Sequence, residues 1–171
     1  MAQTPLQYLK KNFPKQKDSL TLFLKKFDDQ KIIGIHKLVE EASVKAWDEV
    51  NCLECANCCK AMTPTFTKKD LKRIAAFLGM TETEMYNKWL KTDEDNGDIV
   101  NQKQPCQFLD KKTNFCSIYE VRPDDCATFP HFKRKPFNDF NHIHEQNIQY
   151  CPATLKMVNH LKDTIDAGFD W

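Results

Sequence analysis

A run of four cysteines between Asn51 and Lys60 constrains this chain more than any other feature. Cys52, Cys55, Cys58 and Cys59 follow the pattern C-x2-C-x2-C-C. Two such spacings in series let a chain fold back so that several sulfurs face one cation, and thiolates suit zinc, Cu(I) and iron–sulfur clusters. Four more cysteines follow in separate short motifs. We interpret the whole set as metal ligands: Cys52, Cys55, Cys58, Cys59, Cys106, Cys116, Cys126 and Cys151.

Length and compartment favour metal ligation over disulfides. The 171 residues are enough to bury a core without covalent staples. Residues 1–10 lack the apolar segment and cleavage site of a signal peptide. No apolar run approaches the ~20 residues that span a bilayer. We therefore expect a soluble cytoplasmic protein, in which cysteines serve as ligands more often than as disulfides.

Charge and motif content exclude several function classes. The net charge is +1, so no global field attracts nucleic acid or an anionic membrane. The chain has four glycines, too few for a phosphate-cradling loop, and it lacks H-E-x-x-H and G-x-S-x-G. We predict no catalytic residue and no organic cofactor. The expected partner is a metal ion, without nucleic acid or membrane, and a protein partner is left open.

Spacing alone leaves the kind of metal site open. The C-x2-C-x2-C run resembles that of [4Fe–4S] sites, whose remote fourth cysteine is often followed by proline, as in Cys151-Pro152. The thiols suffice for two sites of four cysteines each, or for one cluster with spare cysteines. Side chains of neighbours diverge in an extended chain. Of Cys58 and Cys59, one can therefore serve a second metal, bridge two metals, or not ligate. With so many thiols present, we expect His131, His142 and His144 to be surface histidines.

The first fifty residues are predicted to be helical. Residues 1–15 favour a short helix that ends near Pro14. A second helix carries Leu20, Phe23, Leu24 and Phe27 on one face and is interrupted at residues 28–30. A third continues an apolar stripe from Ile35 towards Val50. We expect residues 1–50 to be an N-terminal helical extension and residues 51–171 to be a cysteine-cluster metal-binding domain.

The second half mixes helices with a hairpin. Thr67–Asp70 and Thr81–Glu84 are start signals of two short helices joined by a tight link. Residues 105–109 and 115–119 are predicted to form a β-hairpin with one thiol on each arm. Pro123 is expected to begin a short helix whose dipole lowers the pKa of Cys126. Residues 131–149 read as an exposed loop, and Cys151-Pro152 as the start of the last helix. The predicted fold class is mainly α with a small β-hairpin, an irregular α+β single domain stapled by metal.

Several of these motifs recur in the order typical of one known family. They are the cluster from Cys52 to Cys59, Thr67-x-x-Asp70-Leu71, Pro105-Cys106-x-Phe108-Leu109, Cys116-x-Ile118-Tyr119-Glu120-x-Arg122-Pro123-x-x-Cys126 and Cys151-Pro152. From about residue 50 to 155 the chain resembles the CxxCxxCC cysteine-cluster proteins of the YkgJ type, associated with chelation of zinc or iron. The resemblance implies metal ligands among the eight thiols. A related cluster in flagellin lysine methylases carries iron–sulfur. One departure is Ala127, where the family usually places a basic residue.

The sequence thus predicts a metal-binding protein that holds zinc or iron as a structural or metal-handling module. The alternative is an Fe–S redox protein or an accessory subunit of an enzyme, and a third reading is a thiol redox sensor. We also expect Arg122 and Glu120 to orient the helix that carries Cys126, either as an ion pair or by hydrogen bonds to sulfurs or carbonyls.

Overall fold

A computed structural model describes residues 3–29 and 32–168. Contacts group the chain into two compact units. The terminal-helix unit comprises Met1–Cys55 and Pro130–Trp171, and the cysteine unit comprises Ala56–Phe129. The C-terminal helix therefore packs with the first helices of the chain. The expected domain division at residue 50 stays a prediction, since contact grouping within one chain does not define independent domains.

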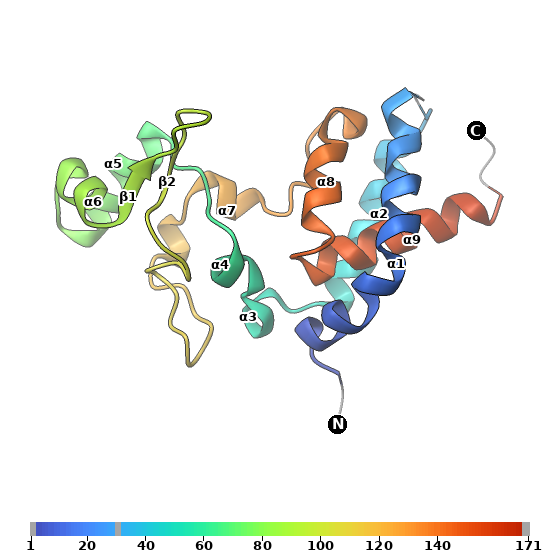
Figure 1. The fold of residues 1–171 in the computed structure, drawn as a ribbon, viewed down its shortest axis with the longest axis horizontal. Coiled ribbons are helices and arrows are strands. Elements are labelled where there is room, and N and C mark those ends of the chain that lie inside the picture. Colours follow the sequence, from blue (N-terminus) through green and yellow to red (C-terminus); the bar gives the residue numbers. More distant parts are fainter. Residues whose placement is uncertain (1–2, 30–31, 169–171) are drawn as a thin grey trace. The chain divides into compact units, whose positions relative to one another are not determined.

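The terminal-helix unit is built around α1 (Pro5–Asp29), α2 (Ile35–Glu49) and α9 (Pro152–Asp166), with α3 (Cys52–Cys55) and α8 (Asn141–Asn147) beside them. Figure 1 shows α9 packed against α1 and α2. The apolar stripes predicted from the 3.6-residue period are buried, which confirms these helices. The buried stripe residues include Leu20, Phe23, Leu24, Phe27, Leu38, Val39, Ala42, Leu155, Val158 and Leu161.

Two expectations for this unit are wrong. Helix α1 continues through Pro14, although proline removes a backbone donor in a helix interior. The end of the helix at Asp29 agrees with the interruption expected at residues 28–30, of which Gln30 lies outside the described residues.

The second wrong expectation concerns residues 131–149. They are not an exposed loop, because they form η2 (Phe137–Phe140) and α8, whose inner side is buried.

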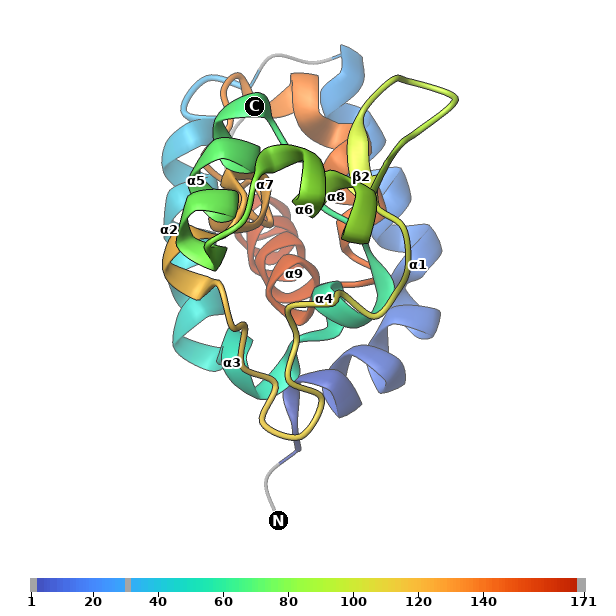
Figure 2. The same ribbon diagram turned by 90° about the vertical axis from the view of Figure 1, so that its left-hand side faces the viewer.

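The cysteine unit begins with α4 (Asn57–Ala61) and the helical hairpin of α5 (Lys68–Leu78) and α6 (Glu82–Trp89). Figure 2 shows α5 and α6 side by side. Both predicted start signals are complete capping boxes, from Thr67 to Asp70 and from Thr81 to Glu84. Gly79 ends α5 with φ 67°, the left-handed conformation that glycine adopts without strain. The inner faces of both helices contribute to a buried cluster with Phe66, Phe108 and Ile118.

The sheet of this unit lies elsewhere than predicted. Strands β1 (Leu90–Thr92) and β2 (Ile99–Asn101) pair antiparallel. Of the hairpin expected at 105–119, the structure retains one isolated bridge between Leu109 and Cys116. Both segments turn immediately after their cysteines, so their backbone N–H groups bond locally and the ladder stops.

The last elements of the cysteine unit are the 3-10 turn η1 (Tyr119–Val121) and α7 (Asp124–Thr128), the short helix predicted after Pro123. Mainly helical structure with one small antiparallel pair of strands confirms the predicted fold class. Within the described residues, no helix combines the length and apolar character needed to cross a bilayer.

Candidate metal centre

Four of the predicted ligands lie close enough in the cysteine unit to influence one another's ionisation. Cys126 lies near enough to Cys59, Cys106 and Cys116 for the charge of each to act on it, and Cys59 acts in the same way on Cys106 and Cys116. The four side chains come from α4, from the turns at residues 106 and 116, and from α7. All four are partly buried and none belongs to a disulfide. Thiols that are separated by up to 67 positions in sequence are thus brought together by the fold.

Backbone hydrogen bonds hold the first three of these segments to one another. The Cys106 N–H donates to the Cys59 carbonyl at 2.8 Å. This hydrogen bond holds the end of the cysteine run against the turn at residue 106. The turns at 106 and 116 are joined by the Leu109–Cys116 bridge and by the Ser117 N–H, which donates to the Phe108 carbonyl at 2.8 Å. Cys106 and Cys116 also pack against the buried cluster around Phe108 and Ile118.

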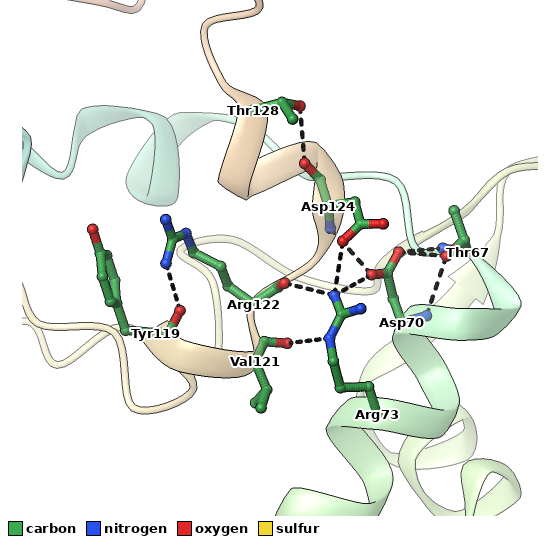
Figure 3. A network of polar contacts seen from close by, with 8 residues as sticks. All are labelled: Thr67, Asp70, Arg73, Tyr119, Val121, Arg122, Asp124 and Thr128. Carbon is green, nitrogen blue, oxygen red and sulfur yellow. Dashed lines mark hydrogen bonds and ion pairs between the residues drawn. The ribbon is translucent and has the colours of Figure 1, made fainter.

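A buried carboxylate at the start of α5 positions α7 (Figure 3). Asp70 is fully buried, and its Oδ1 accepts hydrogen bonds from Arg73 Nη2 at 2.6 Å and from the Asp124 N–H at 3.1 Å. Arg73 Nη2 also reaches Asp124 Oδ1 at 3.0 Å and the Arg122 carbonyl at 2.9 Å. The first turn of the helix that carries Cys126 is therefore tied to the N-terminus of α5. The sequence identified Asp70 only as a helix cap. Arg73, three positions later, was the signal from which its ion pair with Asp70 could have been predicted.

Arg122 makes one of the contacts expected from the sequence, a hydrogen bond to a backbone carbonyl. Arg122 Nη1 donates to the Tyr119 carbonyl at 2.6 Å, and its guanidinium lies 3.9 Å from the centre of the Tyr119 ring. These contacts brace the turn before α7 by a carbonyl hydrogen bond and a cation–π contact. Arg73, which the sequence analysis did not single out, makes the contacts that tie α7 to α5.

The four thiols differ in their readiness to ionise. A hydrogen bond with Cys58, whose sulfur lies 4.0 Å away, lowers the pKa of Cys59 to about 7. Burial raises the pKa of Cys106 to about 11 and raises the pKa of Cys116. The expectation that the helix dipole lowers the pKa of Cys126 is wrong. Burial raises the pKa of this thiol, and the nearby Cys59, Cys106 and Cys116 add to the rise. A cluster of this kind needs a cation before all four sulfurs can be thiolates.

Hydrogen-bond donors surround the sulfurs in the way a thiolate site requires. The backbone N–H of Phe108 acts on Cys106, and that of Ile118 acts on Cys116. The side-chain amide of Asn101 also acts on Cys106. It is buried, yet its Nδ2 makes no full hydrogen bond within the described residues. Donors aimed at sulfur stabilise the ionised form, so the residues present fit a soft cation bound by thiolates.

The remaining four predicted ligands have other surroundings. Cys52 and Cys55 lie on α3 in the terminal-helix unit, the first exposed and the second buried. Cys151 is buried at the N-cap of α9, where burial raises its pKa and the hydroxyl and N–H of Thr154 oppose the rise. Cys55 is near enough to Cys151 to act on its charge. Within the part of the chain that the structure describes, no three ligating side chains are already arranged as a site for an ion. Ligation by the eight thiols therefore stays a prediction.

The expectation of surface histidines is wrong for two of three. His131 and His144 are buried, and His142 is exposed. His144 stacks on Phe137, with ring centres 4.6 Å apart and an angle of 16° between the rings. Both histidines belong to the terminal-helix unit, and His144 is part of its core.

A curated relative matches about half of the chain. The chain is 42% identical over 84 residues to the uncharacterised protein MJ0661 of Methanocaldococcus jannaschii. That match spans 47% of this chain and 44% of the relative, so the chain corresponds to less than half of that protein's length. No solved structure matches the chain.

The family comparison covers all eight cysteines. The model of the CxxCxxCC family, described as a "putative zinc- or iron-chelating domain", matches residues 51–152. This range runs from the residue before the first cysteine to the residue after the last. The matched segment is more than half of the chain, and it includes the turns and helix that bring Cys106, Cys116 and Cys126 to Cys59. The chain therefore belongs to the CxxCxxCC family.

Proposed function

We propose that the cysteine unit binds one zinc or iron ion through Cys59, Cys106, Cys116 and Cys126. The observation that carries this proposal is that four thiols from four separate segments of one unit lie near enough for the charge of one to act on the others. Donors that face the sulfurs and a family described by zinc or iron chelation support it. Cys52, Cys55, Cys58 and Cys151 remain predicted ligands in addition to these four.

A site made only of thiolates leaves no coordination position for a substrate, and such sites are structural. Its ligands span residues 59–126, so the ion would fasten α4, two turns and α7 to one another. Metal binding would then contribute directly to the folding free energy of this unit. We infer a structural or metal-handling role, with the metal acting on the fold and no reaction assigned to it.

Elemental analysis of the full chain, purified without oxygen, tests the proposal. We expect zinc in a colourless protein, or iron without acid-labile sulfide, at about one ion per cysteine unit. Iron with sulfide and a brown colour would replace the single ion by an Fe–S cluster and favour the redox alternative. A protein that contains neither metal, and takes up neither after reduction, would overturn the proposal.

A matched pair of variants on α7 tests the ligand assignment. Cys126→Ser should lower the metal content, because it removes one of the four sulfurs. Ala127→Ser introduces the same side chain at the adjacent exposed position and should retain the metal of the natural sequence. Equal metal content in both variants would remove Cys126 from the site.

A further inference from the structure

A buried amide in strand β2 lies next to the candidate metal centre, and its nitrogen makes no full hydrogen bond to the described residues. Asn101 is 4% exposed, and its Nδ2 makes no full hydrogen bond to the described residues. A buried donor without an acceptor costs about 1–3 kcal/mol, so such groups in native proteins require an explanation. Its hydrogen-bond partner Gln107 directly follows Cys106 in the chain, and the amide lies near enough to the Cys106 sulfur to favour its ionised form.

The structure fixes which end of the amide faces the thiol. Asn101 Oδ1 accepts a hydrogen bond from Gln107 Nε2 at 3.0 Å. The backbone N–H of Asn101 donates to Thr63 Oγ1 at 2.9 Å, and strand pairing with Leu90 holds the residue in β2. With Oδ1 committed to Gln107, the two N–H bonds of Nδ2 remain for another acceptor. The side chain is therefore held by its backbone and by its oxygen, with its donor end left for the sulfur.

We propose that Asn101 is a positioning residue for the metal, donating an Nδ2–H hydrogen bond to the Cys106 sulfur when that sulfur is a metal-bound thiolate. A thiol is a poor acceptor, whereas a thiolate that binds metal still accepts hydrogen bonds, so the donor is satisfied only in the loaded protein. Such a bond orients the ligand and reduces the electron donation from sulfur to metal. Loss of hydrogen bonds of this class typically lowers metal affinity by about 10–100-fold.

This inference rests on the proposed function, and Co²⁺ is a probe that separates the two. Co²⁺ is added without oxygen to the reduced, metal-free full chain, and the thiolate-to-cobalt charge-transfer absorption gives both affinity and band energy. Absence of this absorption in the natural sequence would overturn the four-thiol site itself, and the role of Asn101 with it. Its presence establishes a thiolate site on which the variants are then compared.

Two substitutions remove the donor in different ways. Asn101→Leu removes the whole amide, and Asn101→Asp retains an oxygen that can accept the hydrogen bond from Gln107. We expect both to weaken Co²⁺ binding by about tenfold or more and to move the charge-transfer band to longer wavelength, because a sulfur without its hydrogen bond gives up charge more easily. The control is Asn87→Asp, which makes the same change at an exposed position of α6 and should change neither quantity.

The spectrum and the metal-free protein distinguish positioning from simple packing. Asn101→Leu also removes the acceptor of Gln107 Nε2, so a fall in the melting temperature of the metal-free chain reports that loss, and the charge-transfer band is the readout of the hydrogen bond to sulfur. Weakened binding without a band shift would indicate a packing role only and would overturn the inference. Unchanged affinity and band in both variants would also overturn it, while leaving the four-thiol site intact. If Asn101→Leu does not fold, Asn101→Asp decides by the same two readouts.

Discussion

The buried imidazole of His144 makes the terminal-helix unit sensitive to acid. Its ring lies on α8 against Phe137, and neither ring nitrogen has a hydrogen-bond partner within the described residues. Burial lowers the pKa of His144 to about 4, and the nearby charges of His131, His142 and Arg134 act in the same direction. A histidine in an unfolded chain has a pKa of about 6.5.

The sign and size of the effect follow from linkage between protonation and folding. Between these two pKa values the unfolded chain binds more protons than the folded one, so stability falls as the pH falls from about 6.5 to about 4. The full loss is between about 3 and 4 kcal/mol, at about 1.4 kcal/mol for each unit between the two values. About 1.4 kcal/mol of it should already be lost near pH 5.5. The contribution is complete above the pKa of the unfolded histidine.

Replacing the imidazole with a phenyl ring tests this reasoning. His144→Phe retains the stack on Phe137 and removes both unpartnered nitrogens, so it should be neutral or stabilising near pH 7.5 and more stable than the natural sequence near pH 5.5. Chemical unfolding of the metal-free, reduced chain at both pH values measures the difference. His142→Phe adds the same ring at an exposed position of α8 and should not reproduce the gain. A gain for His144→Phe that does not grow on acidification would refute the assignment of the acid sensitivity to this residue.

Two further tests address the cysteine unit. Asp70→Asn should destabilise the protein by about 1.5–3 kcal/mol, the range for hydrogen bonds to charged groups, because it removes a buried carboxylate that joins α5 to α7. Glu84→Gln makes the same change in the exposed capping box of α6 and should lower the free energy of unfolding, measured with denaturant, much less. Equal losses in the two variants would show that the link to α7 contributes nothing. Removal of metal with a chelator should increase amide hydrogen exchange at residues 106–129 more than within α9, and unchanged exchange at 106–129 would contradict the coupling of metal to fold.

Local signals account for the elements that the sequence predicted well. The capping boxes at Thr67 and Thr81 involve residues three positions apart, so they are readable without tertiary structure. The apolar stripes of α1, α2 and α9 are equally local, since burial follows the helical period. Proline at position 14 was read by the same local rules as a helix end. There the packing of α1 outweighed the cost of a lost backbone hydrogen bond.

Helix α8 was missed because its buried side is not apolar. Phe137, Asn141, His144 and Ile148 are spaced by four, three and four positions and are all buried, which is the helical period. Two of these four residues are polar, so hydrophobicity did not reveal the repeat. Part of the hydrogen-bonding capacity of Asn141 is used, because its Nδ2 donates to the Leu24 carbonyl at 3.1 Å and to Asp28 Oδ1 at 2.8 Å. Partners more than a hundred positions away in sequence cannot be read from a local pattern.

The turns at residues 106 and 116 explain why the predicted hairpin did not form and how two of the predicted ligands come near Cys59. Around Cys106 and Cys116 the backbone donors serve the cysteines: the Leu109 N–H donates to the Cys106 carbonyl, and the Tyr119 N–H donates to the Cys116 carbonyl. The N–H groups of Phe108 and Ile118 act on the two sulfurs. Donors used in these turns are not available to a cross-strand ladder, so alternating apolar residues yielded one bridge and no hairpin. The same turns place both thiols where the charge of Cys59 acts on them.

Cys58 and Cys59, which the spacing treats alike, have different surroundings in the structure. Both residues lie in the short helix α4, where successive side chains point about 100° apart, so they cannot face one centre equally. Cys59 is the member that acts on Cys106, Cys116 and Cys126, and its carbonyl is bound by the Cys106 N–H. Cys58 lies beside it as the hydrogen-bond partner that favours the Cys59 thiolate. Among these four thiols, Cys59 is the one whose pKa is lowered, whereas burial raises the pKa of Cys106, Cys116 and Cys126.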